Sequence, residues 1–358
     1  MADDDPPAGS IMMAEIGETG QQRGRATVTY WAIDAGGSGT TALLANGTRW
    51  KRGSVNPASV GARAADDDLR ELFTAIRVSA AESGDRMTTG WLATATVDAD
   101  APDHELDRLT RLAGEAGLTG TLLISRDVVP LLAAPPLSGR GVAVVCGTGS
   151  GFIASDGERE PVSVGGCEYL GSDEGSAFAI GLSGLRAGVR GVDGRGAPTA
   201  LSAALAELGG GSVQDLARSL AARAFPKSAV AALSPVVCRC WLDGDAVAGA
   251  VVDGALADML DGVRAARDRA GLTGSWSATL SGGVFHGCPE FAAELSARIT
   301  TELGALPPTV VADPVATVLA ALRQHCRRPA RGVENQRSSP PPWFTGRWAW
   351  TRSLGGDG

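Results

Sequence analysis

Two hydrophobic patterns alternate along most of the chain. Short apolar runs that end in polar or glycine residues predict β-strands within residues 27–34, 41–47, 90–97, 120–127, 141–155 and 277–285. Apolar residues at helical spacing predict α-helices within residues 66–84, 104–117, 174–190 and 313–326. Asp66 to Asp68 would then lie at a helix N-terminus, where negative charge is favoured.

A strand, a glycine-rich turn and a second strand follow one another twice, about 110 residues apart. That separation is too long for a solenoid repeat. The order of elements therefore predicts an α/β protein with two similar domains that face each other. Residues 1–26 lack any period and are predicted to be a disordered arm. Residues 328–358 are predicted to be a solvated tail, although Trp343, Trp348 and Trp350 could dock on another surface.

Composition narrows the class of protein. The 358 residues, 44% of them hydrophobic, suffice for two domains with a substantial core, and the net charge of -8 argues against nucleic acid or an anionic membrane as the main partner. The chain starts without a secretory pattern and has no run near the length of a membrane span, so we expect a cytoplasmic protein. Six cysteines form no disulfide framework in a chain this long. Lysine occurs only at Lys51 and Lys227, which we attribute to coding bias.

The first glycine turn, DAGGSGTT at residues 34–41, can be tested against known phosphate-binding devices. It lacks the lysine and the following helix of a P-loop, and its glycines do not fit the dinucleotide fingerprint. What remains is a hairpin whose backbone N–H groups can face an anion. Asp34, at the strand end, would then lie where a divalent cation could gather phosphate oxygens.

Two further glycine turns strengthen this interpretation. GTGSG at residues 147–151 offers the same backbone donors and two hydroxyls, and SGGVF at residues 281–285 allows a ligand to approach the main chain closely. A single such turn is more often structural. Three of them in this order, with an acid at the first, favour a nucleotide site.

These motifs carry a family resemblance. DAGGSGTT, GSVNP at residues 53–57, GTGSG, GGCEYLGSDEGSAFAIG at residues 165–181, SGGVF and DPVATVLAAL at residues 313–322 resemble, in order, the motifs of the BadF/BadG/BcrA/BcrD-type ATPase family. The closest branch is that of the N-acetylglucosamine kinases, within the acetate and sugar kinase/actin superfamily. The resemblance covers about residues 27–326. It implies two actin-like (ribonuclease H-like) lobes, each a mixed sheet flanked by helices, with an ATP cleft between them.

The resemblance also implies domain boundaries and ligand roles. The N-terminal lobe would span residues 27–139 and the C-terminal lobe residues 140–312, and a closing helix at 313–327 would return to the N-terminal lobe. Asp34 would hold Mg²⁺. The backbone of two turns would bind the ATP phosphates, and a third would line the adenosine pocket. The residues concerned are Gly36, Gly37, Ser38, Gly39 and Thr40, then Gly147, Thr148, Gly149 and Ser150, then Gly282 and Gly283.

In the resembling kinases the catalytic base is an aspartate at a strand end before the second phosphate motif, which here is Asp127. The chemistry needs a carboxylate within reach of the sugar hydroxyl, to accept its proton. The alternative is that Asp127 merely caps the next helix. Arg126 stands where the family often has Asn.

Sugar contacts are implied for Asn56, Asp127, Gly165, Gly166 and Asp173, while a turn at Asn56 and a plain helix start at residues 172–176 are the ordinary alternatives. The chain departs from the family pattern beside this site, with Cys167-Glu168 in place of Trp-Gly and Ser172 in place of Gly. The departures put the identity of the sugar in doubt. Glu168 could favour the cation of an amino sugar over an N-acetyl group.

The expected function is transfer of the γ-phosphoryl group of ATP to a hexosamine hydroxyl, with N-acetylglucosamine to its 6-phosphate as the first choice and a homodimer as the assembly. An alternative within the family is an activator ATPase with an iron–sulfur cluster between subunits. Those proteins have a cysteine where this chain has Gly175, and Cys238 and Cys240 lie close to where a second ligand could be. A non-catalytic sugar sensor and a chaperone-like or filament-forming ATPase are further alternatives. Asp34 and Asp127 argue against the sensor, which would need neither a metal ligand nor a base. The chain is too short for the additional subdomains of a chaperone-like or filament-forming ATPase.

Overall fold

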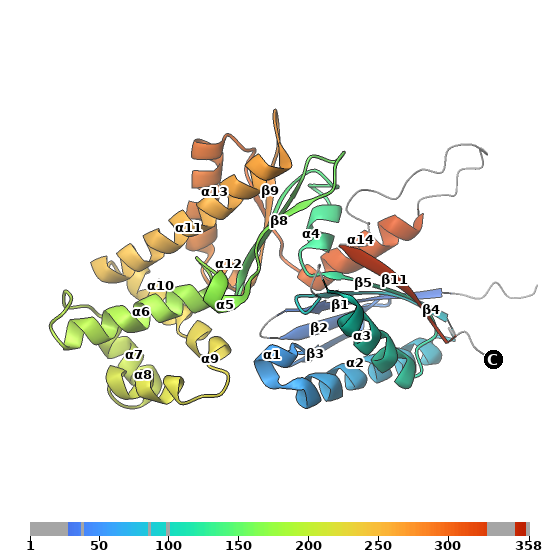
Figure 1. The fold of residues 1–358 in the computed structure, drawn as a ribbon, viewed down its shortest axis with the longest axis horizontal. Helices are drawn as coiled ribbons and strands as arrows, with labels where there is room; N and C mark the ends of the chain where they lie inside the picture. The colour runs from blue at the N-terminus through green and yellow to red at the C-terminus, as the bar shows by residue number, and fades with distance from the viewer. Residues whose placement is uncertain (1–27, 37–38, 85–86, 98–100, 328–347, 356–358) are drawn as a thin grey trace, which may run out of the picture.

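The computed structural model describes residues 28–36, 39–84, 87–97, 101–327 and 348–355. Two lobes, each built on one sheet, lie side by side (Figure 1). The predicted arm at residues 1–26 lies outside the described residues, as do 328–347 and 356–358 of the predicted tail.

The sheet of the N-terminal lobe has six strands in the order β11-β5-β4-β1-β2-β3. Three of them are parallel and are buried on both faces, which explains their near-continuous apolar sequences. The bounds are β1 Val28–Ala35, β2 Thr40–Leu44, β3 Arg49–Arg52, β4 Met87–Thr94, β5 Gly120–Arg126 and β11 Ala349–Leu354.

Helices cover both faces of this sheet. α2 (Ala62–Glu82) and α3 (Asp103–Glu115) bury their apolar stripes on one face. The other face packs against α4 (Val129–Ala133) and α14 (Pro314–Arg327), so the last long helix of the chain rests on the first sheet. The short α1 (Pro57–Val60) precedes α2.

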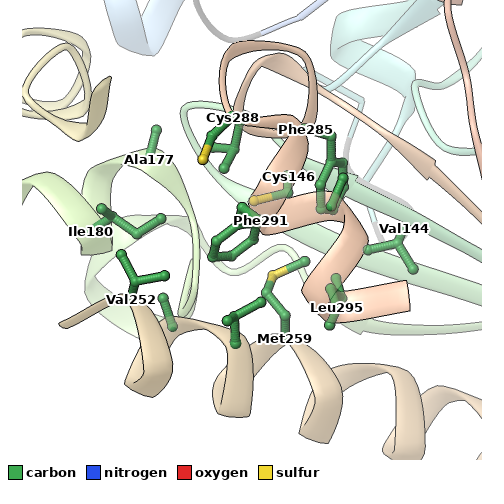
Figure 2. Close-up of a cluster of buried hydrophobic side chains, with 14 of the residues drawn as sticks. Val144, Cys146, Ala177, Ile180, Val252, Met259, Phe285, Cys288, Phe291 and Leu295 are labelled. Carbon is green, nitrogen blue, oxygen red and sulfur yellow. The ribbon is translucent and has the colours of Figure 1, made fainter. Parts of the chain in front are cut away.

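The sheet of the C-terminal lobe has the order β10-β9-β6-β7-β8, with β6, β9 and β10 parallel to one another. Helices pack on it around a core that Figure 2 shows in part, where Phe285, Phe291 and Met259 meet Cys146. The strands are β6 Gly141–Cys146, β7 Ser150–Ser155, β8 Val162–Gly165, β9 Ala278–Ser281 and β10 Thr309–Val310. The helices are α5 Glu168–Gly171, α6 Ala177–Val192, α7 Leu201–Gly209, α8 Val213–Ala221, α9 Lys227–Ala231, α10 Ser234–Leu242, α11 Ala246–Ala270, α12 Gly283–Gly287 and α13 Pro289–Leu303.

Two local predictions need correction. α2 begins at Ala62, so Asp66 to Asp68 lie beyond its first turn rather than at its N-terminus. Asp66 instead forms an ion pair with Arg108 of α3, which ties the two helices together. The helices between residues 199 and 270 were not predicted at all.

The predicted solvated tail is wrong over residues 348–355. β11 adds to the edge of the sheet antiparallel to β5, from Ala349 opposite Ser125 to Leu354 opposite Gly120. Trp350 packs in the cluster beneath α2 and α3, and Trp348 in the cluster beneath α4 and α14. Burial of two tryptophans and a full ladder of backbone hydrogen bonds outweigh the polar, proline-rich composition that precedes them.

Truncation of Trp350 tests this edge strand. Trp350 is 9% exposed, so Trp350→Ala should lower the free energy of unfolding by about 3 kcal/mol, the size expected for a buried tryptophan. Urea unfolding followed by circular dichroism measures the change. Thr351→Ala, at an exposed position of the same strand, should change it by less than about 0.5 kcal/mol. Equal effects from both variants would mean that β11 does not pack on the sheet.

Candidate active site

A cavity of about 770 Å³ lies where the two sheets meet. The parallel strands β1, β4 and β5 of one lobe and β6 and β9 of the other all turn their carboxyl ends to it, which is where open α/β sheets bind ligands. Thirteen predicted site residues line it. They are Asp34, Gly36, Gly39, Asn56, Asp127, Gly147, Thr148, Gly149, Ser150, Gly166, Asp173, Gly282 and Gly283.

Four predicted residues are not among those lining the cavity. Thr40 is buried at the start of β2, and Gly165 ends β8 with an exposed backbone. Gly37 and Ser38 lie outside the described residues. The first turn is nevertheless closed by the N–H of Gly36, which donates to the carbonyl of Gly39 at 3.1 Å.

The second turn, between β6 and β7, is held from below by helix α6. The N–H groups of Ala177 and Phe178, in the first turn of α6, donate to the carbonyls of Gly147 and Thr148 at 2.9 and 3.3 Å. Both carbonyls are thereby already hydrogen-bonded within the protein. A Cβ at Gly149 would lie 2.5 Å from an oxygen of Asp173, so glycine is required there.

The third turn follows β9 and packs directly on the second. Gly282 has a φ of 124°, and a Cβ on it would lie 2.3 Å from the carbonyl oxygen of Cys146. Glycine therefore lets the two turns from neighbouring parallel strands come together. Gly283 starts α12 immediately afterwards.

Three carboxylates influence one another across the cavity. Burial, then the negative charges of Asp127 and Asp313, raise the pKa of Asp34 from 3.8 to about 7. Burial also raises the pKa of Asp127, although the charge of Arg126 and nearby backbone N–H groups counteract it. The hydrogen bond from Arg49 keeps the pKa of Asp313 below its usual value.

Asp127 follows the last residue of β5, and its N–H donates to the carbonyl of Thr94 at 3.1 Å. Helix α4 begins at Val129, with Val128 as its N-cap and no side chain capping it. Helix capping therefore does not account for Asp127. The residue is half-buried and lines the cavity.

The donor set suits a magnesium ion that is shared with phosphates. No group of three or more His, Cys, Asp or Glu side chains within the described ranges is arranged to hold a metal. Mg²⁺ is typically bound through one or two carboxylates plus phosphate and water oxygens, so a complete protein cage is not needed. Asp34, at the strand end beside the first glycine turn, fits that role, because a nearby cation would stabilise the carboxylate against the burial and the negative charges that raise its pKa.

Asp173, a predicted sugar contact, lies in the loop between β8 and α6 and lines the cavity. This residue is 4% exposed and has a φ of 70°, a strained conformation for a residue with a side chain. Its Oδ1 accepts a hydrogen bond from the N–H of Ser150 at 2.9 Å, and its Oδ2 lies 2.8 Å from Nζ of Lys227. Asp173 thus connects the second phosphate turn to the loop between β8 and α6.

Lys227, at the start of α9, also reaches Glu168, with its Nζ donating to Oε2 at 2.7 Å. Burial works to lower the pKa of Lys227, but its bonds to Asp173 and Glu168 outweigh this, and the net pKa lies above the usual value. The negative charge of Glu168 is therefore offset in part by Lys227, which it shares with Asp173. This arrangement argues against the expectation that Glu168 selects a cationic amino sugar.

Asn56 shows its ordinary role. Its Oδ1 accepts a hydrogen bond from the N–H of Ala58 at 2.9 Å and caps α1. Its side chain still lines the cavity. A sugar contact would therefore be made by the amide nitrogen of this side chain.

The family model of the BadF/BadG/BcrA/BcrD ATPase family matches residues 32–307 of the chain. The chain belongs to this family. An N-acetylmuramic acid/N-acetylglucosamine kinase from Clostridium acetobutylicum is 27% identical over 150 residues, which are 42% of this chain. The match spans 49% of the length of that curated relative.

Solved structures establish the fold of this BadF/BadG/BcrA/BcrD family member. A candidate N-acetylglucosamine kinase from Chromobacterium violaceum aligns with a TM-score of 0.62 and 21% identity, covering 82% of this chain and 98% of the other. A second, from Porphyromonas gingivalis, gives 0.63 and 22%, covering 83% and 99%. The MamK double helical filament aligns at 0.52 with 12% identity, covering 85% and 100%. The predicted fold of two actin-like lobes is confirmed.

The cysteine arrangement does not favour the activator branch of the family. Cys238 and Cys240 lie on α10 with both side chains buried in the lobe's core, rather than at a surface that a second subunit could reach. Burial and the neighbouring Cys288 raise the pKa of Cys238 to about 12. An iron–sulfur cluster needs accessible thiolates, and a buried, protonated thiol is a packing residue.

Several residues that line the cavity were not predicted as site residues, among them Arg49, Lys51, Lys227, His286 and Asp313. Arg49 of β3 makes a bidentate contact with Asp313 at 3.1 and 2.5 Å, although the two are 264 positions apart. The sequence held one signal for two of these residues. The chain has only two lysines, and both line this cavity. The attribution of that rarity to coding bias alone missed it.

A neutral side chain at position 34 should stabilise the protein in the absence of ligands. A folded-state pKa of about 7, above the ordinary 3.8, means that stability falls as the pH rises from 3.8 to about 7, and the loss is fully present above 7. Asp34→Asn should therefore raise the melting temperature more at pH 8 than at pH 5. Asp107→Asn, an exposed position on α3, serves as the control. An equal effect of Asp34→Asn at both pH values would contradict the raised pKa.

Proposed function

We propose that this protein is an ATP-dependent sugar kinase that transfers the γ-phosphoryl group to a hydroxyl of a hexosamine. N-acetylglucosamine, phosphorylated at position 6, is the substrate we favour. Family membership and the kinase names of several relatives support the reaction class. The match to the curated relative covers about half of that protein, so the activity and the sugar are our inference.

One observation carries the proposal. Asp127 lies at the end of β5, in the same cavity as the phosphate turns on one side and the Gly166 and Asp173 loop on the other. Phosphoryl transfer to an alcohol needs a carboxylate at that position between donor and acceptor. A sensor that only binds sugar needs neither this base nor the neighbouring Asp34.

The mechanism follows from the charges. Asp127 accepts the proton of the attacking hydroxyl, and its raised pKa makes it a stronger base than an exposed aspartate. The backbone N–H groups of the turns at 147–150 and at 36–40 hold the phosphates. Mg²⁺ bound at Asp34 would neutralise the charge on the phosphate oxygens. Closure of the lobes would exclude water and suppress ATP hydrolysis.

The sugar is expected to be neutral at its amine position. Lys227 forms ion pairs with both Glu168 and Asp173, which weakens the attraction that either carboxylate could offer to an ammonium group. An N-acetyl group, which hydrogen-bonds without charge, fits better than the cation of glucosamine.

The homodimer expected from the family stays a prediction. No helix within the described residues is long and apolar enough to cross a membrane.

Sugar-dependent ADP release tests the function. Purified protein with MgATP should turn over with N-acetylglucosamine and much less with glucosamine, N-acetylmannosamine or glucose. Asp127→Asn should lower kcat by at least about 100-fold with little change in the KM for ATP, because it removes the base and leaves the nucleotide site intact. Asp107→Asn is again the matched control.

Slow ADP release that is indifferent to every sugar would refute the kinase. In that case sugar binding measured by calorimetry separates the remaining possibilities. Binding without turnover indicates a sensor, and no binding indicates an ATPase of another type.

Lys51 should take part in the transfer step. It lies on β3 opposite Thr41 of β2, lines the cavity, and forms no ion pair with the described residues. A transferring phosphoryl group needs nearby positive charge, so Lys51→Met should lower kcat by about 10- to 100-fold. Lys51→Arg should recover part of the loss. Steady-state kinetics at saturating sugar measures both, and wild-type kcat in Lys51→Met would contradict the role.

A further inference from the structure

Arg126 connects the two lobes beside the candidate base. It is the last residue of β5 in the N-terminal lobe, immediately before Asp127. Its Nη1 donates to Oγ of Ser163 on β8 of the C-terminal lobe at 3.2 Å. Its Nη2 lies 3.2 Å from where a Cβ on Gly166 would be, so the guanidinium reaches the loop predicted to bind the sugar.

The C-terminal strand supports this arginine from the other side. β11 pairs with β5 up to Ala349 opposite Ser125, so one step further along this register Trp348 faces Arg126. The guanidinium carbon lies 5.5 Å from the centre of the Trp348 ring, within the range of a cation–π contact. Trp348 is itself only 6% exposed and is fixed in the cluster beneath α4 and α14.

The charge of Arg126 is not used by an ion pair within the described residues. The other cationic side chains of the cavity differ in this respect, apart from Lys51. Arg49 is bound by Asp313, and Lys227 by Glu168 and Asp173. The guanidinium of Arg126 therefore keeps N–H groups that are not bound to a carboxylate. They lie next to Asp127, between the N-terminal lobe and the loop that carries Gly166.

We propose that Arg126, stacked on Trp348 of the C-terminal strand, is a positioning residue that latches the C-terminal lobe to the base-bearing strand when sugar is bound. The proposal rests on the proposed kinase function. It assigns a role to a segment that lies beyond residues 32–307, the part of the chain that the family model matches. The C-terminal strand would thus contribute to catalysis without touching either substrate.

Arginine is suited to this latch for a physical reason. Its planar guanidinium can stack on the indole of Trp348 and still direct an N–H group sideways to the hydroxyl of Ser163. A lysine at this position would carry the charge but could not maintain both contacts. An arginine with a purely structural role would affect the stability of the protein, and its replacement would leave the KM and kcat/KM for sugar unchanged.

The test separates the latch from stability and from the nucleotide site. Arg126→Gln should raise the KM for sugar and lower kcat/KM for sugar by about 10- to 100-fold, since misplacing a reacting group by about 1 Å can have such an effect. The KM for ATP should change less than about twofold, because the phosphate turns are untouched. The ratio of sugar phosphate formed to ADP released should fall, because an unlatched cleft admits water.

Companion variants make the outcome specific. Trp348→Leu should reproduce the Arg126→Gln pattern in weaker form, and Arg126→Lys should restore only part of kcat/KM for sugar. Trp350→Phe, a conservative change in the same strand at a side chain that packs in the other cluster, should have wild-type kinetics. Ser163→Ala removes the far end of the latch and should raise the KM for sugar.

The proposal is overturned if Arg126→Gln and Trp348→Leu keep the wild-type KM for sugar and the wild-type coupling ratio. It is also overturned if the KM values for ATP and sugar rise together. If Arg126→Gln does not fold, as judged by circular dichroism, Ser163→Ala decides, and an unchanged KM for sugar then refutes the latch. Absence of sugar-dependent turnover in the wild type is a different result, which removes the kinase function and the latch with it.

Discussion

Charge compensation in one cavity is the constraint on which this structure depends. Parallel strands of two sheets end there, and two of them carry Asp34 and Asp127, carboxyl groups whose pKa values burial raises. Like charges in a poorly solvated space repel, so the site is least favourable when empty and ionised. Under the proposed function, Mg²⁺ would supply positive charge beside Asp34, and the N–H donors of the glycine turns would bind the phosphates. Binding of the cation would then relieve the repulsion between the carboxylates.

The remaining charges of the cavity are paired across long distances in sequence. Arg49 holds Asp313 at the start of the closing helix, and Lys227 holds Glu168 and Asp173 in the loop next to the sugar. Each pair links segments that are far apart in the chain. Lys51, Arg126, Asp34 and Asp127 form no ion pair within the described residues, and we propose that they act on the ligands or position the groups that do.

The parts predicted correctly from sequence are local. A glycine turn after a strand, or an acid at a strand end, can be recognised from about eight consecutive residues. The structure brings the motifs at Asp34, Gly147 and Gly282 to one cavity. The pairing partners Arg49, Lys227 and Asp313 could not be predicted from such local motifs, because each pair joins residues that are far apart in the sequence. The start of α2 was misplaced for a related reason, since Asp66 serves an ion pair with Arg108 rather than the helix end.

The C-terminal segment is a second feature that could not be predicted from local sequence. Prolines, arginines and tryptophans without period predict a solvated tail, yet β11 completes the sheet. Composition indicates how a segment would behave in isolation. It carries no information about the unpaired edge of β5, with which this segment forms hydrogen bonds. That edge ends at Arg126, one residue from the candidate base, so the strand that covers it also fixes the surroundings of Asp127. A segment added for the stability of a sheet is therefore placed where it can influence proton transfer and closure.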